Sequence, residues 1–129
     1  AIRNTTFREK MIKTYPTAIQ TESGLMYVED KAGEGENAKN GNTVKVHYTG
    51  FFTNGKKFDS SLKKGVPLEF VLGQKRVIGG WDEGIALMNK GAKYTLIVPY
   101  WLAYGERGYP NIIPPKSTLI FDVELVSFK

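Results

Sequence analysis

The 129-residue sequence contains no cysteine and only one histidine, His47. The absence of cysteine excludes disulfide bonds, thiol nucleophiles, cysteine-rich zinc sites and iron–sulfur clusters. A single histidine argues against a histidine-based metal site and against a serine–histidine catalytic pair. The sequence therefore points away from most covalent and metal-dependent chemistry.

Long apolar runs are also absent. No segment approaches the ~18–20 apolar residues that a membrane-spanning helix needs, and the N-terminal stretch lacks the apolar core of a signal peptide. Hydrophobic residues make up 41% of the chain, charged residues 24% and aromatic residues 12%. This composition is typical of a globular protein and excludes disordered and collagen-like chains. At about 150 residues per domain, the length predicts one domain.

The chain has a basic charge balance, with 18 Lys and Arg against 13 Asp and Glu and a net charge of +5. Such a balance can indicate a nucleic-acid partner. The densest basic stretch lies between Lys56 and Arg76, but Asp59 and Glu69 interrupt it. Aromatic residues are not interleaved with these cations as a base-stacking platform requires. We therefore expect a solvated basic surface and no nucleic-acid partner.

Residues 1–23 are expected to form a helical extension or linker that precedes the main domain. Its apolar residues have the spacing of a short amphipathic helix: Phe7, Met11, Ile12 and Tyr15. Thr5 or Thr6 is the expected N-cap, and Pro16 the expected stop. The extension could pack on the domain, mediate a dimer or fray, so both a monomer and a dimer through this segment remain open.

From Gly24 onward, alternating apolar residues predict a mostly β domain over 24–129. We expect strands at 25–28, 44–52, 57–58, 68–72, 94–98 and 118–128, a hairpin turn at Asn54-Gly55, and loops at 33–41 and 60–66. A helix is expected from Trp81 through Met88, with Gly91 ending it in a left-handed conformation. Five or six strands and one short helix predict an α+β fold, in which a curved antiparallel sheet is covered by the helix.

Two features indicate a pocket. Trp81 follows Gly79-Gly80, and these glycines would let the backbone turn sharply and leave little bulk around the indole. The pattern alone leaves open whether Trp81 floors a pocket or is ordinary core. The 17-residue connection 100–116 is far longer than the usual ~4–6 residues, and its apolar residues and prolines predict a rigid flap over a cleft, with Trp101 packing at its root.

Six short motifs resemble the FK506-binding protein (FKBP) family of peptidyl-prolyl cis/trans isomerases. They are HYTG at 47–50, FDSS at 58–61, VIGGWDEG at 77–84, AYG at 103–105, IIPP at 112–115 and LIFDVEL at 119–125. Each motif is weak alone, but their order and spacing over about a hundred residues are specific. The resemblance covers residues 24–129 and leaves the extension outside.

The resemblance implies a twisted antiparallel sheet wrapped around one short helix, with an apolar pocket between them. Carried over by position, it implies that the pocket is lined by Tyr48, Phe58, Asp59, Phe70, Val77, Ile78, Trp81, Tyr104, Ile113 and Phe121, with Tyr109 and Ile112 on the flap. Trp81 would support the substrate proline ring, while the Ile78 N–H and the Tyr104 hydroxyl would bind substrate carbonyls. The implied catalytic residues are Tyr48, Asp59, Trp81, Tyr104 and Phe121.

The activity that this resemblance implies is rotation of X–Pro bonds in flexible polypeptides, as a protein-folding helper, without a cofactor or metal. A non-catalytic proline-binding or chaperone module is the alternative. Proline-containing polypeptides and the macrolides FK506 and rapamycin are the implied partners. The compartment stays open, although the Gly24–Tyr27 segment after a charged helix resembles extracytoplasmic bacterial members more than the minimal cytosolic form.

A few positions differ from the family pattern or admit a second role. Leu68 stands where an aromatic residue is frequent, Lys64 where an arginine often packs near the pocket aspartate, and Gly79 where a bulkier residue is common. Asp59 could instead be a turn-forming Asx residue before Ser60 and Ser61, but the resemblance favours its role in the pocket. His47 alternates with Tyr48 along its strand, so we expect it to face away from the pocket.

Overall fold

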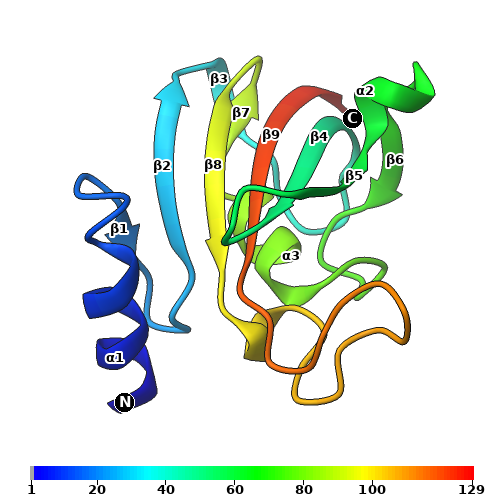
Figure 1. The fold of residues 1–129 in the computed structure, drawn as a ribbon. Coiled ribbons are helices and arrows are strands. Elements are labelled where there is room, and N and C mark those ends of the chain that lie inside the picture. Colours follow the sequence, from blue (N-terminus) through cyan, green and yellow to red (C-terminus); the bar gives the residue numbers. More distant parts are fainter. Residues whose placement is uncertain (1) are drawn as a thin grey trace.

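A strongly curved antiparallel sheet surrounds one short helix in the computed structural model, which describes residues 2–129 (Figure 1). The sheet has seven strands. Six follow in the order β1 (Ile19–Gln20), β2 (Met26–Lys31), β8 (Lys93–Val98), β9 (Leu119–Phe128), β4 (Thr43–Phe52) and β5 (Lys57–Ser60), and β6 (Leu68–Val71) pairs with β4. Helix α3 (Gly79–Ile85) lies on the concave side. The predicted α+β class and curved antiparallel sheet are confirmed.

Strand β4 organises the sheet because it pairs with three other strands. Its whole length pairs with β9, for example Tyr48 with Val123. Its opposite edge is divided, since residues 43–46 pair with β6 and residues 49–51 pair with β5. Between these two strands the chain leaves the sheet as the short helix α2 (Ser61–Lys64), in the segment that the sequence predicted to be a loop. The predicted turn at Asn54-Gly55 does connect β4 to β5.

Helix α3 is shorter than its apolar spacing predicted. It ends at Ile85, and Asn89–Lys90 form strand β7, which pairs with β3 (Glu34–Asn37) inside the predicted loop 33–41. Met88 is fully buried, so it extends the apolar face from a turn instead of from the helix. Gly91 has the expected left-handed φ of 87°, but it connects β7 to β8 and does not end the helix.

The N-terminal extension packs on the convex face of the sheet (Figure 1). Helix α1 (Ile2–Met11) begins before Thr5 and Thr6, so neither threonine is its N-cap, and it ends well before Pro16. Its buried residues form a second apolar cluster with the sheet: Phe7, Met11, Ala18, Met26, Ile97 and Ile120. Neighbours of the last two residues along β8 and β9 face the main core instead, as side chains on a strand alternate between faces. The boundary at residue 23 stays a prediction.

Trp101 joins the extension to the beginning of the long 100–116 connection. It belongs to the 3-10 helix η1 (Tyr100–Leu102), and its indole Nε1 donates to the Ser23 carbonyl at 2.7 Å. The Phe7 ring contacts it edge-on at 5.7 Å, and the Arg3 guanidinium lies 4.5 Å from its ring centre. Trp101 therefore packs where the flap begins, and its main partners come from the extension.

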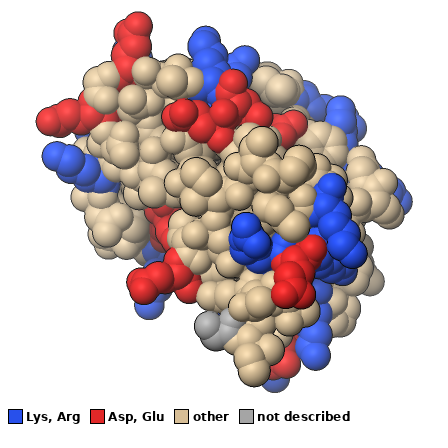
Figure 2. Space-filling view, turned by 90° about the vertical axis from the view of Figure 1, so that its left-hand side faces the viewer, with Lys and Arg blue, Asp and Glu red and all other residues tan. Residues whose placement is uncertain are grey.

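Charged side chains of both signs are distributed over the face that α1 and the first strands cover (Figure 2). This distribution is typical of a solvated surface rather than of a continuous cationic groove for nucleic acid. Within residues 2–129, no helix combines the length and the apolarity needed to cross a bilayer.

We expect the contact between α1 and the sheet to contribute to the stability of the whole domain. Phe7→Ala should lower the free energy of unfolding by about 3 kcal/mol, because it removes a buried ring from the second cluster. Ile2→Ala on the same helix is the matched control, since Ile2 is 87% exposed and should change stability by less than about 0.5 kcal/mol. Chemical denaturation measures both values. Equal effects of the two variants would show that the extension does not pack on the sheet.

Candidate active site

A cavity of about 170 Å³ opens on the concave side of the sheet, beside α3. Eight of the residues expected from the sequence surround it: Tyr48, Phe58, Asp59, Val77, Ile78, Trp81, Tyr104 and Phe121. They come from β4, β5, β9, α3, the segment just before α3 and the long 100–116 connection. Residues that are distant in the sequence thus meet in one hollow, which two further residues, Leu68 and Arg76, complete.

Trp81 forms the floor of the cavity. The indole is only 4% exposed, and the rings of Tyr48 and Phe121 stand nearly perpendicular to it, with centroids 4.7 Å and 5.3 Å away. Phe70 lies on another side at 6.1 Å. The sequence left open whether Trp81 belongs to a pocket or to the core, and the structure places it at their boundary. Its Nε1 is buried without a hydrogen-bond partner in residues 2–129, a cost that native proteins seldom accept away from functional sites.

Asp59 is the acidic residue of the cavity wall, and the protein holds it from several sides. The Tyr48 hydroxyl donates to its Oδ2 at 2.6 Å, and the Ser60 backbone N–H donates to its Oδ1 at 2.9 Å. Lys64 lies 3.5 Å from the same Oδ1, but both side chains are substantially exposed, so this ion pair adds little. Asp59 lies in strand β5 and accepts from the next residue, so it does not form the Asx turn considered for it, and its carboxylate borders the cavity.

The Tyr48 phenol is kept neutral by its surroundings. Burial raises its pKa, and the hydrogen bond to Asp59 raises the pKa further, because the carboxylate requires the phenol proton. The hydroxyl is therefore fixed as a donor to Asp59. The pair presents an oriented carboxylate beside aromatic walls.

Two donors at the cavity are free to meet a ligand. The backbone N–H of Ile78 has no acceptor in the described part of the chain, although the Ile78 carbonyl accepts from Trp81 N at 3.0 Å. The Tyr104 side chain is 40% exposed and stacks on Tyr109, with ring centroids 5.9 Å apart. Burial, and secondarily Asp59, raises the pKa of Tyr104, so its hydroxyl keeps its proton. Both groups can donate to carbonyl oxygens.

Four of the expected residues lie outside the cavity lining. Phe70 packs behind Trp81, and Ile113 is buried in the main core. Tyr109 and Ile112 lie about half exposed on the flap, where a bridge between Tyr109 and Ile113 closes the turn. Phe70 and Ile113 therefore lie behind the cavity wall, whereas Tyr109 and Ile112 are available at the surface.

The glycines before Trp81 serve a different purpose from the sharp turn that the sequence suggested. Neither Gly79 nor Gly80 has a positive φ, and both belong to α3. A Cβ on Gly80 would lie 2.5 Å from Val98 Cγ1, so this glycine is required by the close approach of the helix to β8. A Cβ on Gly79 would find its nearest neighbour, Leu102, at 3.7 Å, and the space there can accept a side chain.

Asp82 positions the part of the cavity wall next to Trp81, a role that the sequence analysis did not predict. Its carboxylate accepts from the backbone N–H groups of Gly73 at 2.9 Å and Lys75 at 3.2 Å. Lys75 has a φ of 58°, a conformation that non-glycine residues seldom adopt. The turn that leads into Arg76 is therefore attached to the helix that carries the floor. The available signal in the sequence was an aspartate that follows two turn residues, Gly73 and Lys75, a few positions upstream.

His47 lies away from the cavity, as the strand alternation predicted. Its Nδ1 is 2.9 Å from the Ser61 hydroxyl oxygen, which also accepts from the backbone N–H of Tyr48 at 2.8 Å. His47 is thus linked to the junction of β4 and α2 and does not line the pocket.

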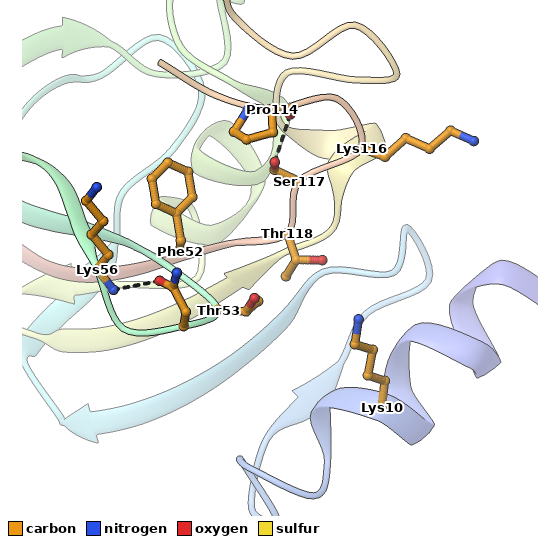
Figure 3. A pocket seen from close by; sticks show the side chains of 9 residues that line it. Lys10, Phe52, Thr53, Lys56, Pro114, Lys116, Ser117 and Thr118 are labelled. Atoms are coloured by element: carbon orange, nitrogen blue, oxygen red, sulfur yellow. Dashed lines mark hydrogen bonds between the residues drawn. The ribbon is translucent and has the colours of Figure 1, made fainter. Parts of the chain in front are cut away.

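A larger hollow, of about 490 Å³, lies between α1, the β4–β5 turn and the segment before β9 (Figure 3). Lys10, Lys56 and Lys116 border it, and none of the twelve residues expected in the site does. Phe52 contributes to this hollow and packs on Phe58 of the aromatic cavity at 4.9 Å. The two hollows are therefore separated by aromatic rings, and only the smaller one has the predicted lining.

Comparison with known proteins identifies the family. Residues 34–126 match the family model described as FKBP-type peptidyl-prolyl cis-trans isomerase. The chain is 54% identical over 106 residues to a probable FKBP-type peptidyl-prolyl cis-trans isomerase of Haemophilus influenzae, covering 82% of this chain and 43% of that protein. It is 48% identical over 104 residues to an FK506-binding protein of Neisseria meningitidis, covering 80% and 95%. The crystal structure of FkpA from Escherichia coli superimposes with a TM-score of 0.86 at 44% identity, covering 99% of this chain and 58% of that one.

The chain thus belongs to the FKBP-type peptidyl-prolyl cis-trans isomerase family. Proteins of this family bind proline-containing peptides and FK506-type ligands. The chain spans less than half the length of several relatives, including the Haemophilus protein.

We expect neighbouring glycines of α3 to respond oppositely to the same substitution. Gly80→Ala should lower stability and displace Trp81, because the new methyl group overlaps Val98. Gly79→Ala is the matched control and should leave stability equal or slightly higher, since alanine favours the helix. Thermal unfolding and Trp fluorescence measure both effects. Similar losses in the two variants would contradict the proposed close approach of α3 to β8.

We expect alkaline pH to destabilise the protein partly through Tyr48. An unfolded tyrosine ionises near pH 10, whereas the raised pKa of Tyr48 keeps the folded phenol protonated. The stabilisation is complete below pH ~10 and is lost as the pH rises toward the higher folded pKa. Denaturation between pH 8 and 11 should show a smaller decline of unfolding free energy for Tyr48→Phe than for the wild type. Parallel curves would refute the raised pKa.

Proposed function

We propose that this protein is a peptidyl-prolyl cis/trans isomerase that acts on flexible polypeptides and assists their folding. The observation that supports this most strongly is the aromatic cavity with Trp81 at its floor, which is apolar, narrow and bordered by unpaired donors. Family membership points to the same activity. Because the chain covers only part of several relatives, the activity is inferred for the domain present here.

The cavity suits the transition state of proline isomerisation. Rotation about an X–Pro bond crosses a barrier of ~18–20 kcal/mol and takes tens to hundreds of seconds in the absence of a catalyst. The twisted amide has lost its resonance, so its carbonyl is less polar than that of the planar ground state. A dry, aromatic seat favours the less polar state, and this differential binding lowers the barrier. The reaction forms no covalent intermediate.

Each residue around the cavity has a role in this proposal. Trp81, Tyr48 and Phe121 hold the proline ring between three aromatic surfaces. The Ile78 N–H and the Tyr104 hydroxyl donate to carbonyls on either side of the proline, so that one bond rotates while its neighbours stay fixed. Asp59, oriented by Tyr48, places a negative charge beside the rotating amide.

A non-catalytic proline-binding module would use the same seat. It would hold the proline without lowering the rotation barrier, so binding and catalysis must be measured separately. FK506 and rapamycin are the ligands we propose as probes, because they would occupy the aromatic cavity and compete with a peptide.

We also propose the division into an extension, residues 1–23, and an isomerase domain, residues 24–129.

The test measures kcat/KM on a proline tetrapeptide in a protease-coupled assay, with and without rapamycin. Asp59→Asn should lower kcat/KM by about tenfold, or ~1.4 kcal/mol, because it removes the charge while it retains the shape. His47→Ala is the control and should keep the wild-type rate, since His47 lies outside the cavity. Circular dichroism shows whether each variant is folded.

Two outcomes would contradict the proposal in different ways. An inactive wild-type protein that still binds rapamycin would support the binding module. Unchanged activity of folded Asp59→Asn would reject the role of Asp59 while leaving the isomerase assignment in place.

A further inference from the structure

We propose that Arg76 makes the cavity selective for prolines that have an acidic residue within two positions in the sequence. This inference rests on the proposed function, because it specifies which prolines the same site prefers. Arg76 lines the mouth of the cavity and its side chain is exposed to solvent.

The charges around the cavity leave Arg76 as the cation available to a ligand. Asp59 is already engaged by the Tyr48 hydroxyl, the Ser60 N–H and Lys64. Within residues 2–129 the ion pairs closer than 4 Å are Lys64–Asp59 and Lys39–Glu36, so Arg76 has no such partner. A carboxylate brought to the mouth by a ligand would therefore meet a guanidinium that no protein carboxylate neutralises.

The backbone before Arg76 is held in place, which favours a defined position for this cation. Lys75 adopts a left-handed conformation, and Asp82 accepts hydrogen bonds from the backbone on both sides of Gln74. Sparsely populated backbone conformations persist where the surrounding structure enforces them, often at ligand sites. Asp82 adjoins Trp81 on α3, so the turn that presents Arg76 is fixed relative to the floor of the cavity.

The position of Arg76 along the wall sets which ligand residues it can reach. Arg76 is two residues before Ile78, whose N–H we propose to bind a carbonyl next to the proline. Two residues of chain separate the Cα atoms of Arg76 and Ile78 by at most ~7 Å, and two residues of an extended ligand span about the same distance. A guanidinium and a carboxylate can then form two parallel hydrogen bonds.

The expected selectivity is modest because Arg76 is exposed and water screens the interaction. Exposed ion pairs change equilibria by about 1.4-fold to fivefold. We therefore expect Glu to raise kcat/KM by about twofold to fivefold over its neutral isostere Gln at the preferred position. The effect should decrease at high salt, where the Debye length is only ~3 Å at 1 M.

The experiment uses proline peptides that carry Glu, Gln or Lys at each of the two positions before and the two positions after the proline. A protease-free assay by exchange NMR avoids any preference of a coupling protease. The wild type should prefer Glu over Gln over Lys at one or more positions at low salt. Arg76→Gln should abolish this order, and Arg76→Glu should reverse it, when each variant's rates are taken relative to its own rate on the Gln peptide.

Lys10→Glu is the matched control because it makes the same charge change on α1, where Lys10 is exposed and borders the other hollow. It should keep the wild-type preference. Equal rates for Glu, Gln and Lys peptides at all four positions would overturn the inference, and so would an equal loss of preference in Lys10→Glu and Arg76→Glu. Absence of isomerisation of every peptide would instead overturn the proposed function.

Discussion

The close approach of helix α3 to strand β8 is the constraint on which the site depends. Gly80 and Gly84 allow it, because a Cβ on either would lie within 2.7 Å of a side chain of β8. At this distance the indole of Trp81 reaches the rings of Tyr48 and Phe121 and closes the bottom of the cavity. A larger residue at position 80 would raise the helix from the sheet, and the cavity would lose its floor. The same helix also carries Asp82, which holds the adjoining wall. The packing of α3 on β8 therefore determines the geometry of the site.

The cavity exists because strand β4 does not have a single partner on one of its edges. Strands β5 and β6 share this edge, and the chain between them leaves the sheet as α2. Phe58 and Asp59 on β5 and Leu68 at the beginning of β6 thereby come to the rim of the same hollow. Gly50, opposite Asp59 on β4, keeps the space between the Phe58 and Phe121 rings, since a Cβ there would lie 2.7 Å from Phe58 Cζ. A regular sheet with one continuous strand at this edge would fill the hollow with side chains.

The sequence allowed the fold class and the family to be predicted, while several local elements required the structure. Period-two alternation identified β4 and β9 because each strand is long and has one buried face. It missed β3 and β7, which are four and two residues long and contain mostly polar or glycine residues. The spacing of Trp81, Ile85 and Met88 predicted too long a helix, because buried side chains from a turn can continue a helical periodicity. Arg76 could not be recognised as a rim residue, since its neighbourhood depends on a turn that is held by Asp82 six residues later.

An apolar site that acts without covalent chemistry must limit the number of uncompensated charges in contact with it. Asp59 satisfies this demand through its bonds to Tyr48 and Ser60, which let a carboxylate border a cavity of aromatic rings. Arg76 satisfies it differently, because its side chain stays in solvent and avoids the desolvation that a buried cation would suffer. The two charges are therefore accommodated in different ways. Asp59 is held against the aromatic rings by the Tyr48 hydroxyl, which suits the role proposed for it beside the rotating bond. Arg76 stays in solvent, where a weak and screened attraction can discriminate among ligands without holding the product.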